Sequence, residues 1–413
     1  MKDTIIDVLI IGAGPSGCVA ASYLHKNNAN IKVVEKSKFP RFVIGESLLP
    51  RCMDHFEEAG LLEALKSFGF EKKEGARFLQ DDIICEFDFS KKHGEGWNWT
   101  WQAPRADFDN VLAQELVKKG VDVVFEHEVI DVVFDENGTS TTTIKDENGN
   151  NYTVTAKNII DSSGYGRVLP RLLDLNLPSE LPKHSSVFTH VKDIKRPEGY
   201  QGTRITFDVL DTQTWLWVIP FSDGNTSIGY VGPTEHLESF PGNTTEKLQA
   251  MVRQSEFFKD RFENIDYSFE PILIKNYSIS VKQLFGKGYV LTGNSTAFLD
   301  PIFSSGVTFA TESGLLAAKL IAKQLKGNQV DWEKEYAEYI LDGVNVFTSY
   351  VNEWYSGNLQ KLFFHRPENP EIKAQICAVL AGYVWDKSNP FVTKHERIVA
   401  TMAHLLEMEE SKS

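Results

Sequence analysis

A glycine-rich turn follows the first apolar run of the chain. Val8 to Ile11 lead directly into Gly12-Ala13-Gly14-Pro15-Ser16-Gly17, a G-x-G-x-x-G pattern, before a stretch with helical character. Glycines at these three positions permit a tight turn, close approach of the backbone to a pyrophosphate, and close packing of a helix on a strand. Phosphates would then lie at a helix N-terminus, where free N–H groups and the helix dipole favour negative charge. Glu35 ends the next apolar run, where an acid can hold ribose hydroxyls. The pattern predicts a bound dinucleotide that contains ADP.

Basic residues follow this acid. Lys36 and Arg41 precede Gly45-Glu46-Ser47 in a stretch that could wrap an extended cofactor, with Arg41 near phosphate and Ser47 near the ring system. A solvated basic loop is the alternative interpretation.

Length and composition indicate an ordinary globular protein. The 413 residues predict two domains or one domain with a large insertion, and 42% hydrophobic and 24% charged residues are typical of a globular chain. The net charge of −14 argues against nucleic acid or an anionic membrane as the main partner. No uninterrupted apolar segment approaches the ~20 residues of a membrane span.

Cysteine and histidine spacing gives no sign of a metal site. The four cysteines form no C-x-x-C pair, and the ten histidines show no metal-ligand spacing. A disulfide framework is not expected either. A cytoplasmic, reducing location is therefore predicted, without a metal.

The elements that must position these residues alternate in type along the chain. Apolar residues recur at helical spacing from Leu48 to Phe68, and Trp97, Trp99 and Trp101 are predicted to share one face of a strand. A helix is expected to open at Pro104. Strands are expected from Val121 to Phe134 and from Tyr152 to Ile160.

The second half begins with strand patterns and ends with helical ones. Residues 187–279 are rich in β-branched and aromatic side chains and predict a mixed, mostly antiparallel sheet. A further strand ends at Gly293-Asn294, and a helix rich in alanine and leucine follows Gly306. From Val330 the pattern is helical.

Three separated segments, residues 12–35, 161–164 and 293–306, point to one cofactor. Their arrangement resembles the FAD-binding fold of the aromatic hydroxylases, in which the last segment usually reads Gly-Asp where this chain has Gly293-Asn294. The resemblance implies an α/β fold with a three-layer FAD-binding domain of the glutathione-reductase-like Rossmann type (residues 1–76, 104–170 and 283–328). An inserted mixed β-sheet substrate domain (77–103 and 171–282) and a helical C-terminal region (329–413) complete it.

Motif and resemblance together imply a set of contacts to FAD. They are made by Gly12, Gly14, Pro15, Ser16, Gly17, Glu35, Lys36, Arg41, Ser47, Arg105, Val129, Asp161, Gly164, Gly293, Asn294, Asp300, Pro301, Gly306 and Val307.

A narrower resemblance is carried by Trp215-Leu216-Trp217-Val218-Ile219-Pro220. This W-x-W-x-I-P stretch is similar to the signature of flavin-dependent halogenases, as are Gly45-Glu46-Ser47-Leu48-Leu49-Pro50, Lys73-Glu74-Gly75-Ala76 and the loop from Pro301 to Gly306. Leu380-Ala381-Gly382 looks like the phenolic branch of that family.

The resemblance implies a reaction of reduced FAD, oxygen and chloride or bromide with an electron-rich arene. Backbone N–H groups of Ser305 and Gly306 would hold the halide, and Lys73 would act on hypohalous acid beside the substrate. Trp215, Trp217, Ile219 and Pro220 would keep the substrate off the flavin. Lys72 competes for the role of Lys73.

Other functions remain open from the sequence. The substrate is either a free aromatic molecule or one tethered to a carrier protein, and the resemblance allows a separate flavin reductase as the source of FADH2. The closest rival function is an aromatic monooxygenase that uses NAD(P)H. An alkene reductase of the geranylgeranyl type and a non-catalytic flavoprotein are further alternatives.

Overall fold

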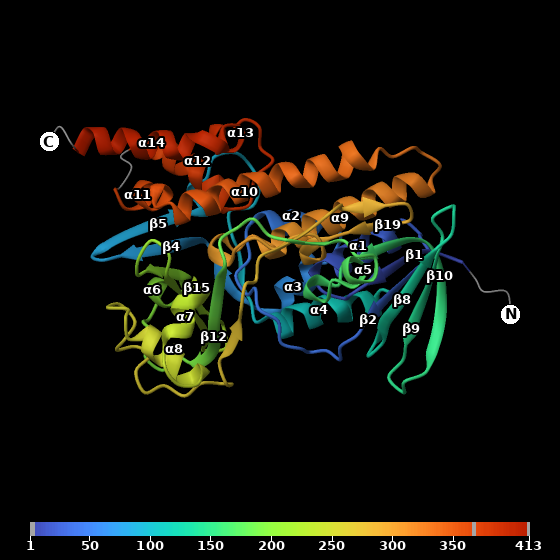
Figure 1. Cartoon of the computed structure of the whole chain (residues 1–413), viewed down its shortest axis with the longest axis horizontal. Coiled ribbons are helices and arrows are strands. Elements are labelled where there is room, and N and C mark those ends of the chain that lie inside the picture. Colours follow the sequence, from blue (N-terminus) through green and yellow to red (C-terminus); the bar gives the residue numbers. More distant parts are fainter. Residues whose placement is uncertain (1–4, 366–368, 411–413) are drawn as a thin grey trace.

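The computed structural model describes residues 5–365 and 369–410. Residues 1–4, 366–368 and 411–413, which belong to the predicted FAD-binding and C-terminal regions, lie outside the described residues. Two large sheets lie at opposite ends of the molecule, and the C-terminal helices lie along one side (Figure 1). The first sheet has eight strands and the second has seven.

The first sheet is parallel at its centre. Its path runs β18-β19-β10-β1-β2-β7, and β8 and β9 extend it beside β10. Val8 of β1 lies opposite Asn158 and Ile31, so the strand that carries the glycine motif is paired on both edges. The strands are β1 (Ile6–Ile11), β2 (Ile31–Glu35), β7 (Asp122–Phe125), β8 (Glu128–Phe134), β9 (Ser140–Lys145), β10 (Asn151–Asp161), β18 (Phe285–Gly286) and β19 (Tyr289–Leu291).

Helices cover this sheet because its central strands are apolar on both faces. Val8, Leu9 and Ile10 are all fully buried, as expected for a strand covered on both sides. The helix α9 packs against both α1 and α2. The helices of this part are α1 (Pro15–Lys26), α2 (Arg51–Glu58), α3 (Leu62–Phe68), α4 (Arg105–Lys118), α5 (Val168–Leu172) and α9 (Gly306–Leu325).

The second sheet is mixed and mostly antiparallel, as predicted. Its order is β16-β12-β15-β14-β13-β4-β5, and only β13 and β4 pair in parallel. The strands are β4 (Gly75–Gln80), β5 (Ile83–Asp88), β12 (His184–Lys192), β13 (Thr206–Val209), β14 (Trp215–Pro220), β15 (Asn225–Pro233) and β16 (Ile272–Ile274). Small helices α6 (Tyr200–Thr203), α7 (Thr234–Ser239) and α8 (Thr244–Val252) accompany it.

Two short sheets connect these parts. The strand β3 (Glu71–Lys73) pairs with β6 (Thr100–Gln102), and β11 (Asn176–Pro178) pairs with β17 (Ile279–Val281). Ser47 forms an isolated bridge with Gln102, so the loop before α2 is tied to β6.

The C-terminal region is helical, as predicted. It contains a π-helical turn (Glu333–Glu338), α10 (Tyr339–Tyr355), α11 (Asn358–Phe364), α12 (Pro370–Leu380), α13 (Pro390–Thr393) and α14 (His395–Glu410). Its apolar side chains share one core with the second sheet, in which Phe78 contacts Trp354 and Phe363. In Figure 1 these helices lie against β4 and β5. Among residues 5–365 and 369–410, none of the helices combines the length and apolar character that a membrane crossing needs.

Two local predictions were wrong. The stretch from Leu48 to Phe68 forms two helices, because the chain turns at Gly60, whose φ is +70°. The strand predicted over the three tryptophans is only Thr100–Gln102. Trp97 and Trp99 precede it and pack edge to face on one another, with ring centroids 5.6 Å apart.

Candidate functional site

One cavity of about 480 Å³ connects the segments that the sequence singled out. Its walls come from the first sheet, the loop before α2, β14 and the start of α9. The predicted residues on its walls are Gly12, Gly14, Pro15, Ser16, Glu35, Lys36, Arg41, Ser47, Arg105, Val129, Gly164, Trp215, Trp217, Ile219, Gly293, Asn294, Asp300, Pro301, Ser305, Gly306 and Val307. Gly17, Lys73, Asp161 and Pro220 are not on these walls.

The glycine turn fits a pyrophosphate. Gly12 has a φ of +99°, which favours glycine, and Gly14 opens α1 on the cavity wall. A Cβ added to Gly14 would lie 3.7 Å from an Arg41 Nη atom, so a guanidinium stands beside the bare backbone. Gly17 differs from both, because its Cβ would lie only 2.0 Å from the Gly12 carbonyl oxygen. This glycine permits close packing and makes no wall of the cavity.

Glu35 is held at the end of β2 by backbone donors. Its Oε2 accepts a hydrogen bond from Ala13 N at 2.9 Å, and its Oε1 accepts one from Ser37 N at 2.9 Å. Each carboxylate oxygen has further acceptor capacity, so the group can also receive ribose hydroxyls. Its geometry fits the adenosine ribose of FAD.

The buried carboxylate of Asp109 holds the side chains of Arg41 and Arg105 in position. Asp109 of α4 accepts hydrogen bonds from Arg105 Nε at 2.8 Å and from Arg41 Nη1 at 2.9 Å. Arg105 also donates to the carbonyls of Ile44 and Gly45, at 3.3 and 3.4 Å. Both guanidinium groups on the cavity wall are therefore fixed in position, as an anion site requires.

Asp161 supports the site from behind. It is fully buried, and its carboxylate accepts hydrogen bonds from the backbone N–H groups of Ser163 and Leu169 and from Ser295 Oγ. These hydrogen bonds give the carboxylate a structural role, and its predicted contact with the cofactor stays a prediction. Burial raises the pKa of this carboxyl group. Pro220 is also off the wall, and its carbonyl accepts a hydrogen bond from Gln102.

The signature tryptophans are pinned by their indole N–H groups. Trp215 Nε1 donates to Tyr355 Oη at 3.2 Å, and Trp217 Nε1 donates to Ser227 Oγ at 3.0 Å. Tyr355 in turn donates to Asp300 Oδ2 at 3.0 Å, so the aromatic wall is joined to the Asp300-Pro301 loop. That loop ends where α9 begins at Gly306, and the first N–H groups of a helix lack intrahelical acceptors.

Lys73 lies immediately behind the wall. Its Nζ donates to Ser47 Oγ at 2.7 Å and to the Leu48 carbonyl at 2.8 Å, and Ser47 itself lines the cavity. Burial lowers the pKa of the Lys73 ammonium from 10.5 to about 7. Lys72 points the other way, since it is ion-paired with Glu74 at 2.6 Å on the exposed face of β3. Of the two lysines, only Lys73 lies beside the cavity.

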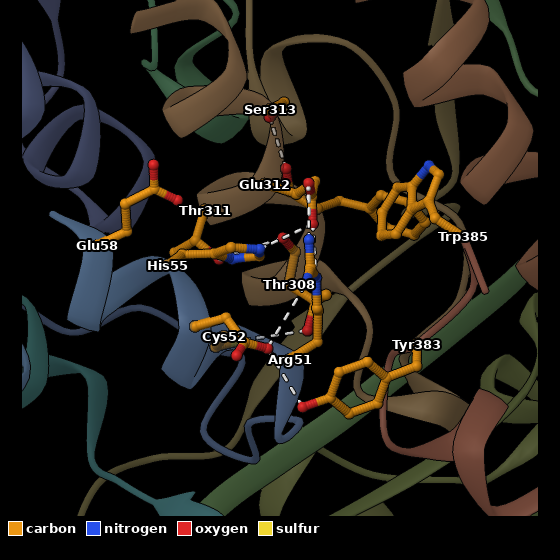
Figure 2. A network of polar contacts seen from close by, with 12 residues as sticks. Arg51, Cys52, His55, Glu58, Thr308, Thr311, Glu312, Ser313, Tyr383 and Trp385 are labelled. Carbon is orange, nitrogen blue, oxygen red and sulfur yellow. Dashed lines mark hydrogen bonds and ion pairs between the residues drawn. The ribbon is translucent and has the colours of Figure 1, made fainter. Parts of the chain in front are cut away.

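A charged network fixes the helices on either side of the site. Figure 2 shows Arg51 and His55 of α2 directed toward Glu312 of α9. His55 Nε2 lies 2.7 Å from Glu312 Oε2, and Arg51 Nε donates to the same oxygen at 2.9 Å. Because α2 follows the Ser47 loop and α9 begins at Gly306, this network sets the separation of two cavity walls.

Replacing Glu312 with Gln is expected to destabilise the fold by about 3 kcal/mol, as breaking a buried ion pair does. Burial opposes ionisation of Glu312, but the hydrogen bond and charge of His55 and the charge of Arg51 outweigh it and lower the pKa to about 2. A carboxyl group with a lowered folded-state pKa stabilises the fold above pH 4.5, and this contribution is lost as the pH falls toward 2. Urea unfolding between about pH 2 and 7 measures it. A variant with wild-type stability at neutral pH would contradict the assignment.

Glu46 and its partner His190 were given no role in the sequence analysis. Glu46 is on the cavity wall and was noticed only as part of a motif. His190 of β12 contacts Glu46 from 144 positions away, and no local pattern marks it. In the described part of the chain, no group of three or more His, Cys, Asp or Glu side chains is arranged to hold a metal ion.

Comparisons with known proteins agree with this geometry. A family model described as an FAD binding domain matches residues 5–247. The chain is 27% identical over 387 residues to 1H-pyrrole-2-carbonyl-(peptidyl-carrier protein) brominase of Pseudoalteromonas luteoviolacea, covering 92% of each chain. It is also 27% identical over 430 residues to the corresponding chlorinase of Pseudomonas fluorescens, covering 97% of this chain and 95% of the relative.

A solved structure matches almost the whole chain. The crystal structure of a flavoprotein/dehydrogenase from Cytophaga hutchinsonii superposes with a TM-score of 0.96 at 50% identity, covering 98% of this chain and 100% of the other. The predicted fold class, the FAD cofactor and the relationship to flavin-dependent halogenases are confirmed.

Proposed function

Because the chain belongs to the family defined by the FAD binding domain, with relatives that are a brominase and a chlorinase, we propose that it halogenates an electron-rich aromatic substrate. The observation that carries this proposal is the buried Lys73, hydrogen-bonded to a serine on the wall of the FAD cavity, with a pKa of about 7. A buried lysine with its pKa near neutrality can exist as an amine or as an ammonium at working pH.

When bound in reduced form, FAD supplies the electrons with which oxygen and a halide give hypohalous acid. The protein's part is to hold and direct the reactants. The backbone N–H groups of Ser305 and Gly306, at the start of α9, are a suitable place for the halide. Trp215 and Trp217, held by Tyr355 and Ser227, form a rigid apolar wall that separates the substrate from the ring system.

In this proposal Lys73 acts from behind Ser47. As an ammonium it donates a hydrogen bond to hypohalous acid that has reached the Ser47 hydroxyl, and this polarises the oxygen–halogen bond. As an amine it takes the halogen from hypohalous acid, with the loss of water, and passes it to the arene, whose ring proton returns to the lysine nitrogen. Either form keeps the electrophile beside the tryptophan wall. The free energy required to bury the lysine supports a functional role over a structural one.

The proposed substrates are electron-rich rings such as pyrroles and phenols. The two curated relatives act on a pyrrole carried by a peptidyl-carrier protein. A ring of that kind, free or carrier-bound, and a phenol share the electron-rich character that electrophilic halogenation requires. We propose that a separate flavin reductase supplies FADH2, and that chloride or bromide is the second substrate.

The test is mass spectrometry of a panel of phenols, resorcinols and pyrroles. The protein is incubated with FAD, an external flavin reductase, NADH, oxygen and bromide or chloride. Replacement of ring hydrogen by halogen is the expected result. Gain of oxygen without halogen, or fast NADH oxidation by the protein alone that a phenol stimulates, would overturn the proposal in favour of a hydroxylase.

A further inference from the structure

Glu46 carries a buried oxygen without a protein partner at the cavity. Its side chain is fully enclosed, yet the residue lines the cavity. Oε1 lies 2.5 Å from His190 Nε2, whereas Oε2 accepts no hydrogen bond from any of residues 5–365 and 369–410. A buried carboxylate oxygen without a donor is costly, so a donor from outside the protein is expected to complete it.

Neighbouring cations do not meet this need. Arg105 lies close enough to interact electrostatically with Glu46, but its N–H groups donate to Asp109 and to the carbonyls of Ile44 and Gly45. Lys73 is directed to Ser47 and Leu48. Neither cation therefore donates a hydrogen bond to Glu46 Oε2.

The partner of Glu46 belongs to the sheet that carries the tryptophan wall. His190 and Phe188 are two positions apart on β12 and so share one face of the strand. The Phe188 ring lies 5.8 Å from the Trp217 ring and 6.2 Å from the Phe42 ring. The His190 ring is itself surrounded by Phe42, Phe221 and Phe269. The histidine that holds Glu46 is thus part of an aromatic cluster that extends to Trp217.

From this arrangement we propose that Glu46 is a substrate-binding residue, whose Oε2 accepts a hydrogen bond from a ring O–H or N–H of the arene. His190 is its positioning residue, since it holds the other oxygen. A hydrogen bond from a ring O–H or N–H to a carboxylate pushes electron density into the ring and favours electrophilic attack. Such a hydrogen bond selects phenols and pyrrole-type N–H heterocycles over rings without a donor. That the ligand is an arene rests on the proposed function.

The experiment compares matched ligands on the FAD-loaded, oxidised protein. Resorcinol and 1,3-dimethoxybenzene form one pair; pyrrole-2-carboxamide and its N-methyl derivative form the other. Dissociation constants are read from the perturbation of the flavin absorbance. The proteins are the wild type, Glu46→Leu, Glu46→Gln, His190→Phe and, as a control for lost charge, Glu256→Gln, whose side chain is exposed.

In the wild type the donor-bearing ligand is expected to bind about tenfold more tightly, the value of one hydrogen bond to a charged acceptor. Glu46→Leu should reduce this preference to about twofold or less. Glu46→Gln should keep part of it, since an amide oxygen still accepts. His190→Phe should weaken it, and Glu256→Gln should keep it in full.

Equal affinities within each pair for the wild type, or an unchanged preference in Glu46→Leu, would overturn the proposal. The flavin imide N–H is the other candidate donor, so FAD and its N3-methyl derivative are titrated into wild type and Glu46→Leu. If wild type discriminates between these flavins and Glu46→Leu does not, the donor is the cofactor and the substrate assignment is wrong.

Halogenation is measured separately on the same proteins. Donor-dependent binding that Glu46→Leu abolishes, in a protein that transfers no halogen, contradicts the proposed function and leaves the Glu46 assignment standing. Halogenation by a wild type that binds both members of each pair equally contradicts the Glu46 assignment alone.

Discussion

Replacing Lys73 with methionine is expected to lower halogenation by at least ~10²-fold, the scale of a lost proton donor or acceptor. FAD affinity should stay within about twofold of wild type, because Lys73 is behind Ser47 and not on the cavity wall. Product formation is measured by mass spectrometry, and FAD binding by fluorescence titration. Flavin reoxidation by oxygen should continue in the variant, so that reduced FAD is consumed without transfer of halogen to the substrate.

The same variant should be more stable than wild type, by roughly 1 kcal/mol or more at pH 7. Burial lowers the pKa of Lys73 from 10.5 to about 7. Between pH 7 and 10.5 the Lys73 side chain is therefore protonated in the unfolded chain and neutral in the folded chain. The cost of burying Lys73 therefore grows as the pH falls from 10.5 to 7 and is constant below it. Methionine removes this cost. The stability difference should disappear above pH 10.5.

Lys72→Met is the matched control, one position away on the exposed side of β3. Its ion pair with Glu74 is exposed, so unfolding free energy should change by less than about 0.5 kcal/mol, and halogenation should be unaffected. Loss of halogenation in Lys72→Met with full activity in Lys73→Met would reverse the assignment of the two residues.

Features encoded by neighbouring residues were predictable from the sequence. The G-x-G-x-x-G turn, the acid that ends β2 and the alternating tryptophans of β14 each depend on the chain within a few positions. A strand with two-residue periodicity places Trp215 and Trp217 on the same face whatever lies opposite. These residues line the cavity together with the Asp300-Pro301 loop.

Partners far apart in the chain were not predictable. His190 meets Glu46, and Glu312 meets Arg51, only because β12 and α9 pack where they do. Asp161 shows a second difficulty: a strand-end acid before a glycine turn has the pattern of a cofactor contact, and here backbone N–H groups that follow it in the chain donate to its carboxylate. A single sequence does not distinguish a carboxylate facing a ligand from one that holds its own loop.

Two glycines of the motif are expected to serve different purposes, Gly17 in the stability of the fold and Gly14 in cofactor binding. Gly17→Ala is expected to destabilise the fold by roughly 3 kcal/mol, at the upper end of the cost of overpacking. Its Cβ would lie 2.0 Å from the Gly12 carbonyl oxygen and 3.3 Å from Ser162 Cβ, so α1 must move away from the strand end. The obstacle is backbone, which cannot rotate aside as a flexible side chain can. Urea unfolding of the protein without added FAD measures the loss.

Gly14→Ala is the counterpart, because its Cβ would meet nothing closer than 3.7 Å and its φ of −74° suits alanine. Unfolding free energy without FAD should stay within about 0.5 kcal/mol of wild type. The added methyl group stands on the cavity wall where the backbone approaches the pyrophosphate, so FAD affinity should fall about tenfold or more. If Gly14→Ala bound FAD as tightly as wild type, the pyrophosphate would have to lie elsewhere. If Gly17→Ala lost FAD without losing stability, Gly17 would belong to the binding surface and not to the packing of α1.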